Sequence, residues 1–168
     1  MTKISMHAAS VPAFAKMLGN MLSWLEAAKA HAEARKFPAD NYLGLRLAPD
    51  MLPFTKQIQI ASDAAKGCVA RLAGQEIPKY EDDEATLAEL AERIRKTRDY
   101  VLSVPAAAFE GSEDREITIP RRSGEALKFD VLSYLTHFAQ PNFYFHATTT
   151  YALLRHAGVP LGKSDYLG

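Results

Sequence analysis

The sequence has few of the features that mark secreted or membrane-spanning proteins. Cys68 is the only cysteine in 168 residues, so no disulfide can form within the chain and we expect a reducing, cytoplasmic environment. The first residues, MTKISMHAASVPAF, lack the uninterrupted apolar core of a signal peptide. No run of apolar residues approaches the roughly 18 that a membrane-spanning helix needs. We therefore expect no association with a membrane.

An excess of charge of one sign is also lacking, because 20 basic residues face 20 acidic ones. Without a net field, nucleic acid is not an expected partner. Basic residues cluster from Arg93 to Arg98, but acidic residues interleave with them, so we interpret the cluster as a solvated helix face. Glycine-rich phosphate loops and nucleophile elbows are absent. Cys68 lies on an apolar helical stripe, which predicts an inert thiol in the core.

Helical periodicity dominates what is present, and we expect one domain over residues 1–168. The apolar stripes predict four helices, at about Ser10–Arg35, Met51–Ala73, Asp83–Ser103 and Val131–Ala157. Pro12 would then lie in the first turn of the first helix, where its missing N–H costs nothing. Asp50 and Asp130 are the predicted N-caps of the second and fourth helices, and Gly74 and Gly158 the residues that end them.

The periodicity changes between the third and fourth helices. REITIP alternates, RRSG has the composition of a turn and ALKF can return, so we predict a hairpin that pairs Glu116–Ile119 with Ala126–Phe129. The fold class is therefore all-α, a four-helix bundle with a small β-hairpin. The connections between the first and second helices and between the third and fourth are longer than tight turns, which permits a crossover.

The fourth helix carries the strongest candidate site. Pro141 cannot donate to the carbonyl of His137, which predicts a kink. Beyond it, one face holds Asn142, His146, Thr149 or Thr150, and Leu153. From the sequence, three roles are open for His146: metal ligand, general base or hydrogen-bonded core residue. Its candidate partners are Asn142 and three residues of the second helix, Gln57, Gln59 and Asp63. Because amide oxygens are poor ligands for zinc or nickel, the residues favour a core histidine over a metal ligand.

The other histidines are weaker candidates. His156 lies in the last turn of its helix and is interpreted as structural or exposed, and the role of His137 is left open. His7 precedes the first helix and is placed over the end of the bundle, while His31 is expected to be exposed. Arg46 and Asp50 are expected to form a surface ion pair.

Four stretches of the chain resemble a bacterial family of unknown function within the DinB/YfiT-like four-helix bundles, a group to which metalloenzyme activity is assigned. They are ASVPAFAKML, RLAPDMLPFTKQIQIASDAAKGCVARLAG, GSEDREITI and HFAQPNFYFHATTTYALLRHAGVPLGKSDYLG. The resemblance implies a divalent metal held by one histidine of the second helix and an H-x-x-x-H pair of the last. Here the pair reads Asn142 and His146, and the second-helix position falls near Gln59, within a residue or two.

Three hypotheses follow for the function. The working hypothesis is a degenerate metal site kept as a small-molecule pocket around His146, lined by Gln57, Asp63, Thr149 and Thr150, with His146 as the tentative catalytic residue and no bound metal. The second is a transferase or hydrolase that uses a divalent metal (Zn, Ni or Mn) held by His146 with Asn142, Gln59 or Asp63. The third is a non-enzymatic homodimer that buries the apolar fourth helix.

Overall fold

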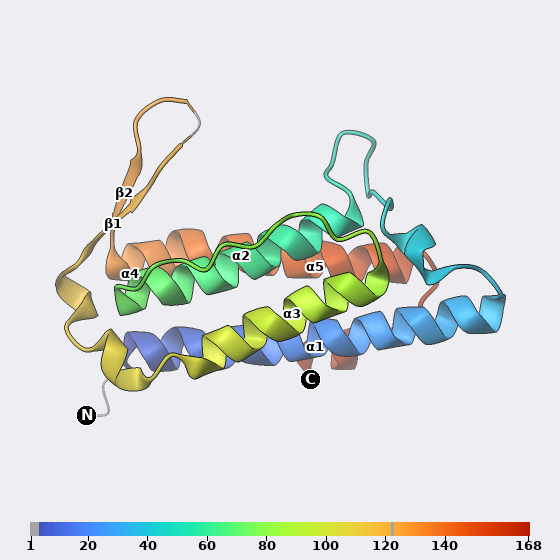
Figure 1. Cartoon of the computed structure of the whole chain (residues 1–168), viewed down its shortest axis with the longest axis horizontal. Helices are drawn as coiled ribbons and strands as arrows, with labels where there is room; N and C mark the ends of the chain where they lie inside the picture. The colour runs from blue at the N-terminus through green and yellow to red at the C-terminus, as the bar shows by residue number, and fades with distance from the viewer. Residues whose placement is uncertain (1–3, 122) are drawn as a thin grey trace.

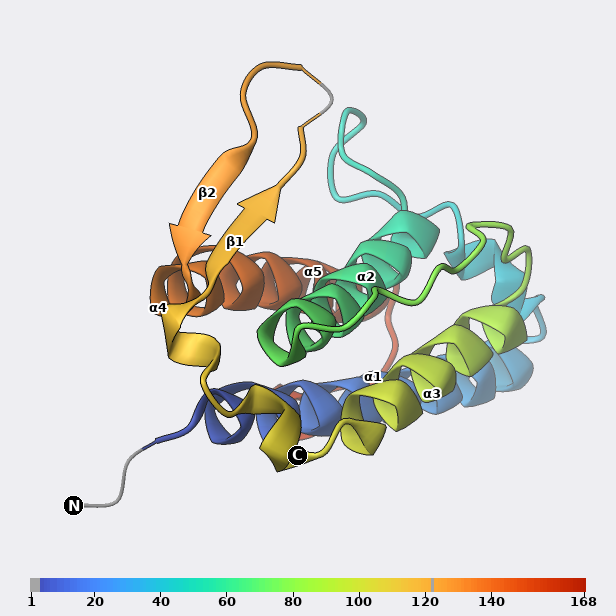
Figure 2. The same cartoon turned by 60° about the vertical axis from the view of Figure 1, so that its left-hand side comes forward.

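The four periodic segments form four long helices in the computed structural model, which describes residues 4–121 and 123–168. They are α1 (Met6–Arg35), α2 (Phe54–Ala73), α3 (Leu87–Ser103) and α5 (Gln140–His156). The helices lie side by side as a bundle, with α1 packed mainly on α3 and α2 packed on both α5 and α3 (Figures 1 and 2). The predicted all-α bundle is confirmed, and no described helix is long and apolar enough to cross a membrane.

The order of helix directions differs from a simple up-and-down bundle. The chain runs along α1, returns along α2, crosses back through an extended segment and then runs along α3 in the direction of α2 (Figure 1). We call this segment, residues 74–86, the strap. The lengths of the first and third connections permitted a crossover but did not fix one, and in the structure it is the second connection that spans the length of the bundle. Short 3₁₀ helices occur in the other connections: η1 (Ala39–Tyr42), η2 (Ala106–Phe109) and η3 (Ser112–Asp114).

Three of the four helices begin at residues other than those predicted, and in α1 and α3 a side-chain cap sets the first turn. The Ser5 hydroxyl accepts from the Ala8 N–H at 3.1 Å, so α1 starts earlier and Pro12 lies inside it, where it removes one backbone hydrogen bond. Pro53, not Asp50, is the N-cap of α2. The third helix begins after Thr86, whose hydroxyl forms a capping box with Glu89. The acidic residues before Thr86 therefore belong to the strap and not to α3.

The hairpin pairs β1 (Glu116–Ile119) with β2 (Leu127–Asp130) in antiparallel register, with Ile117 opposite Phe129. The second strand lies one residue later than predicted because Asp130 both pairs with Glu116 and caps the next helix. Its carboxylate accepts from the Ser133 N–H at 2.9 Å, as predicted for the cap. The hairpin projects from one end of the bundle (left in Figure 1).

The last long helix is continuous but not uniform. It begins as α4 (Val131–Ser133), widens into the π-helical segment η4 (Tyr134–Ala139) and continues as α5. The π segment lies directly before Pro141, where the sequence predicted a kink. A π turn is a known way to absorb an interruption in the hydrogen-bond pattern of an α-helix. The short helix α6 (Lys163–Leu167) then returns to α1, where the Trp24 Nε1 donates to the Asp165 carbonyl at 2.9 Å.

Candidate functional site

The polar residues of α2 face two different neighbours. Gln57 and Gln59 are two residues apart, which separates them by about 200° around the helix axis. Gln57 faces α5 and Gln59 faces the strap and α3. The residues that the sequence grouped into one pocket are thus distributed over both sides of α2.

On the α5 side, the structure brings Gln57 and His146 together. The His146 Nδ1 lies 2.6 Å from the Gln57 Oε1, and the Gln57 Nε2 donates to the carbonyl of Leu52 at 2.9 Å. Because the Leu52 carbonyl can only accept, it fixes the orientation of the amide, and Nδ1 of His146 must carry the shared proton. The Nε2 of a neutral His146 is then a free acceptor. Burial lowers the pKa of His146, which is 8% exposed, and so favours this neutral form.

Thr149 and Thr150, which the sequence also assigned to the pocket, use their hydroxyls within α5. Thr149 donates to the Phe145 carbonyl at 2.7 Å, and Thr150 donates to the His146 carbonyl at 2.9 Å. Both side chains are buried, so these bonds satisfy hydroxyls that would otherwise lack water. They support the helix that carries His146 and leave no further proton to donate to a ligand.

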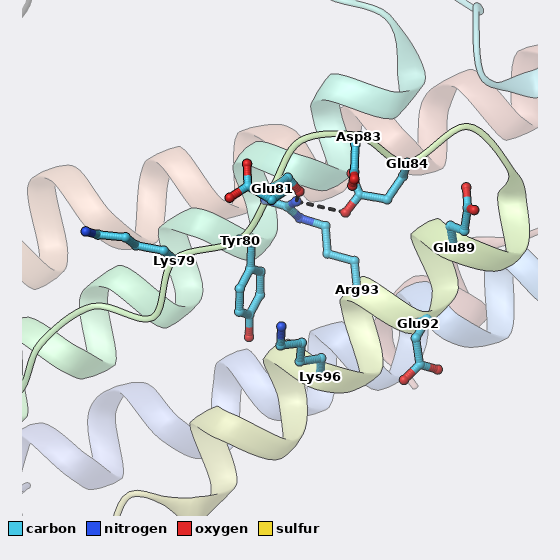
Figure 3. A pocket seen from close by; sticks show the side chains of 9 residues that line it. All are labelled: Lys79, Tyr80, Glu81, Asp83, Glu84, Glu89, Glu92, Arg93 and Lys96. Carbon is cyan, nitrogen blue, oxygen red and sulfur yellow. Dashed lines mark hydrogen bonds and ion pairs between the residues drawn. The ribbon is translucent and has the colours of Figure 1, made fainter.

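On the α3 side, Gln59 and Asp63 belong to an ionic cluster centred on Arg93. Arg93 is 4% exposed and donates to Glu84 and Asp63 at 2.9 Å each, with Asp82 at 3.1 Å. Gln59 donates to the second Glu84 oxygen at 2.7 Å. Figure 3 shows Arg93 reaching from α3 towards Glu84 on the strap. The sequence assigned Arg93 to a solvated face, and this is wrong, because the strap covers it.

Cations and an aromatic ring complete this cluster. The Lys66 ammonium lies 2.8 Å from the Asp63 carboxylate, and it stands 4.6 Å from the centre of the Tyr80 ring. The Lys96 ammonium and the Arg93 guanidinium also lie over that ring, at 4.3 and 5.3 Å. A hollow of about 410 Å³ lies beside the cluster. Since the buried charges neutralise one another, the cluster fastens the strap to α2 and α3.

Asn142 lines a smaller cavity of about 160 Å³ between α2, η4 and the hairpin. Its apolar wall includes Ile60, Ile119 and Phe138, and its polar groups are Asp63, Arg71, Tyr134 and Asn142. Within the residues that the structure describes, the Asn142 side chain makes no hydrogen bond and Arg71 has no carboxylate partner. The sequence singled out Asn142 and Asp63 but missed Arg71 and Tyr134. The sequence did contain one indication of the position of Arg71, which is the glycine at position 67, one turn earlier on the same helix.

Gly67 determines where the Arg71 guanidinium lies. A Cβ at position 67 would stand 2.8 Å from the Arg71 Nη1, so the glycine leaves the space that the guanidinium occupies. The Nη1 also donates to the Tyr134 hydroxyl at 3.2 Å. Burial raises the pKa of Tyr134, and also that of Cys68, to about 12. Both groups are therefore neutral at physiological pH and do not compensate the charge of Arg71.

The donor set does not fit the metal that the family resemblance implies. Of the three positions, two hold amides. The second-helix position was placed near Gln59, within a residue or two, and the residue of that stretch that faces His146 is Gln57, whose amide is engaged at both ends by His146 and Leu52. Asn142 lines the cavity beside Arg71, whose positive charge disfavours a cation there. Over residues 4–121 and 123–168, no three His, Cys, Asp or Glu side chains are grouped so that they could hold a metal ion.

The remaining candidates lie away from α2. His31 is half-buried against the predicted exposure, because its Nδ1 lies 2.7 Å from the Tyr42 hydroxyl. His7 was expected to precede the first helix, which is wrong, because it lies in the first turn of α1, where it packs on Phe109. His137 and His156 are exposed. Arg46 donates to the carbonyl of Met51, so the expected pair with Asp50 is not formed.

Comparisons with known proteins agree with this fold. Residues 6–167 match the family described as "Domain of unknown function (DUF1993)". A search of curated proteins finds no match. The chain is similar to a crystal structure described as a DinB family member protein from Shewanella denitrificans, with 42% identity, a TM-score of 0.89, and coverage of 96% of this chain and 91% of that one. The chain therefore belongs to the DUF1993 family and has a DinB-like fold.

Proposed function

We propose that the protein binds a small molecule in the seam between α2 and α5. The observation that carries this proposal is the cavity of about 160 Å³ in which the unbonded Asn142 amide and the guanidinium of Arg71 meet an apolar wall. A concave, mostly apolar space with a few convergent polar groups is the usual form of a ligand site. The neighbouring η4 segment is π-helical, and such turns occur frequently at functional sites.

The Gln57–His146 pair lies in the same seam. His146 follows Asn142 by four residues, which places it about 6 Å further along α5. Its free Nε2 can accept a proton or a hydrogen bond from a ligand that extends along the seam. We therefore keep His146 as the candidate acid–base group and assign the binding contacts to the cavity. Nothing in this arrangement requires a metal, and the donor set supports no metal-dependent transferase or hydrolase.

The experiment compares binding by wild-type protein with binding by Asn142→Ala. A panel of short carboxylates, primary amides, alcohols and amines is titrated while the side-chain amide signals of ¹⁵N-labelled protein are followed. Compounds that shift the Asn142 signal should bind the variant about tenfold more weakly, the effect of losing one or two hydrogen bonds. Asn41→Ala on the exposed part of η1 is the matched control. A panel that leaves every cavity signal unchanged would contradict the proposal.

A homodimer is the second candidate. Leu52 and Phe145 are 47% and 56% exposed and flank the Gln57–His146 pair in sequence, so they offer apolar surface next to it. Light scattering of untagged protein tests this candidate. A dimer whose dissociation constant rises in Phe145→Ser supports it, and a monomer at all concentrations removes it. Metal analysis of the same preparation tests the metalloenzyme hypothesis, for which near-stoichiometric zinc, nickel or manganese would be required.

A further inference from the structure

The charge balance of the cavity points to the chemistry of its ligand. The guanidinium of Arg71 carries a positive charge, and within the described residues no carboxylate lies within ion-pair distance of it. Its one side-chain hydrogen bond goes to the hydroxyl of Tyr134, which is neutral. Cys68, a turn earlier on α2, is also neutral. A partly buried guanidinium is thus left with no counter-charge from the described part of the protein.

Asp63 does not supply that counter-charge, although it lines the same cavity. Its carboxylate accepts from Arg93 at 2.9 Å and from Lys66 at 2.8 Å, and both cations are buried beneath it. The three cations Arg93, Lys66 and Lys56 are shared among the three carboxylates Asp63, Asp82 and Glu84, so the Asp63 end of the cavity is close to neutral. The cavity as a whole favours an anion at the Arg71 end and does not repel one from the Asp63 end.

The position of the guanidinium is built into α2. The absence of a Cβ at Gly67 lets Arg71 lie back along the helix, and the contact with Tyr134 of η4 holds it from the other side. A planar guanidinium held in this way presents its remaining N–H groups as a fork, the geometry that matches a carboxylate. Asn142 can add one donor from α5.

The size and the wall of the cavity limit the rest of the ligand. A volume of about 160 Å³ corresponds to roughly five water molecules at liquid density. Ile60, Ile119 and Phe138 line it with apolar surface, which suits a short hydrocarbon group and not a second charge.

We propose that the ligand of this cavity is a small monocarboxylate with a short hydrocarbon body, whose carboxylate pairs with Arg71 and Asn142 while the hydrocarbon packs against Ile60, Ile119 and Phe138. This inference rests on the proposed function, because it names the chemical class of ligand for the same site. It adds that the site prefers a negatively charged ligand and that this preference comes from the positive charge of Arg71.

Matched pairs of probes test the inference. Butanoate and 3-methylbutanoate are titrated against butanamide and 3-methylbutanamide, which have the same shape without the charge. The carboxylates should bind about tenfold or more tightly than the amides, since hydrogen bonds to a charged group are the stronger ones. Arg71→Gln should remove this preference, and Arg95→Gln, an equal loss of charge on the exposed face of α3, should keep it.

A second variant, Gly67→Ala, keeps the positive charge of Arg71 but displaces its guanidinium. Gly67→Ala places a methyl group where the guanidinium lies, so carboxylate binding should weaken while the net charge is unchanged. Circular dichroism melts establish that both variants are folded. Equal binding of carboxylates and amides in the wild type, still dependent on Asn142, would overturn this inference and leave the proposed function intact. If neither kind of probe perturbs the cavity, the carboxylate inference is overturned, and the alcohols and amines of the wider panel decide the proposed function.

Discussion

The charged groups on the two sides of α2 differ in whether they are paired with groups of opposite charge. Towards α3, Arg93 has three carboxylates around it, and Lys66 and Gln59 are each paired with one of them. Towards α5, the Arg71 guanidinium has only a neutral hydroxyl, and Asn142 has no protein partner among the described residues. On the first side the charges are paired within the protein, although the Gln59 Oε1 and the Arg93 Nε are buried without a partner among the described residues. On the second side the charge of Arg71 has no partner of opposite sign among those residues.

This difference separates a structural role from a binding role. A closed set of buried charges fixes the position of the strap, and such a set is costly to open because the remaining charges lose their partners. Polar groups that face a cavity and have no protein partner can instead bond to a ligand there. Four predictions test the comparison, from the largest expected effect to the smallest.

Arg93→Met should be the most destabilising change. It leaves Glu84, which is nearly buried, and Lys66 in a cluster whose central cation is gone. Removing one member of a buried ion pair costs about 3–5 kcal/mol, and the half-exposed Asp63 and Asp82 reduce this to about 3 kcal/mol. Urea denaturation measures the loss. Arg95→Met, at an exposed pair on the same helix, should change stability by less than about 1 kcal/mol. Similar losses in both variants would mean that the cluster does not hold the strap.

Gln57→Leu should cost less, about 1–3 kcal/mol, because it leaves the buried Nδ1–H of His146 and the Leu52 carbonyl without their partner. The double variant Gln57→Leu/His146→Leu removes one of these unsatisfied groups. It should therefore be less destabilised than the sum of the two single changes, in a thermodynamic cycle from the same urea titrations. If the two single changes add up to the double change, the contact between Gln57 and His146 contributes nothing to the free energy of unfolding.

The two sides should lose stability in different pH ranges. Burial lowers the pKa of His146 below its usual 6.5, so the folded chain binds fewer protons than the unfolded chain and stability falls as the pH drops below 6.5. For Glu84, burial alone would raise the pKa, but hydrogen bonds from Arg93 and Gln59 outweigh it and lower the pKa below 4.5. The contribution of Glu84 is therefore complete above pH 4.5 and is lost below it.

Unfolding free energies measured from pH 8 to pH 3 should resolve a step below pH 6.5 and a further step below pH 4.5. Gln57→Leu/His146→Leu should remove the first step. Arg93→Met should shrink the second without abolishing it, because the capping carboxylates Glu89 and Asp130 also have lowered pKa values. An unchanged second step in Arg93→Met would contradict the role given to the cluster.

Gly67→Ala should have the smallest effect on stability. Alanine in a helix interior gains up to about 1 kcal/mol over glycine, and the guanidinium that it displaces is the flexible end of a side chain. We expect the free energy of unfolding to rise by about 1 kcal/mol or less, while carboxylate binding falls. A variant that is both less stable and unchanged in binding would show that Gly67 serves the packing of α2 and not the cavity.

The parts of the fold that depend on local chemistry could be predicted from the sequence. The hairpin position, the cap at Asp130 and the irregularity before Pro141 follow from turn composition, a side-chain acceptor and a missing N–H, all of which act within a few residues. The prediction of where α3 starts was wrong because that start depends on contacts between residues that are distant in the chain. Asp82 and Glu84 have the charge that suits a helix N-terminus, but they bind Arg93, eleven and nine residues later in the chain.

The sequence by itself determined an all-α bundle with a hairpin, and it identified His146, Gln57 and Asn142 as polar residues of the helices that meet in the seam. Only the tertiary structure decided that Gln57 faces His146 while Gln59 and Asp63 face Arg93, because a rotation of about 200° between neighbouring glutamines puts them against different helices. It also decided that Arg71 has no counter-charge within residues 4–121 and 123–168. Long side chains reach across several turns, so their partners are set by packing and not by their place in the chain.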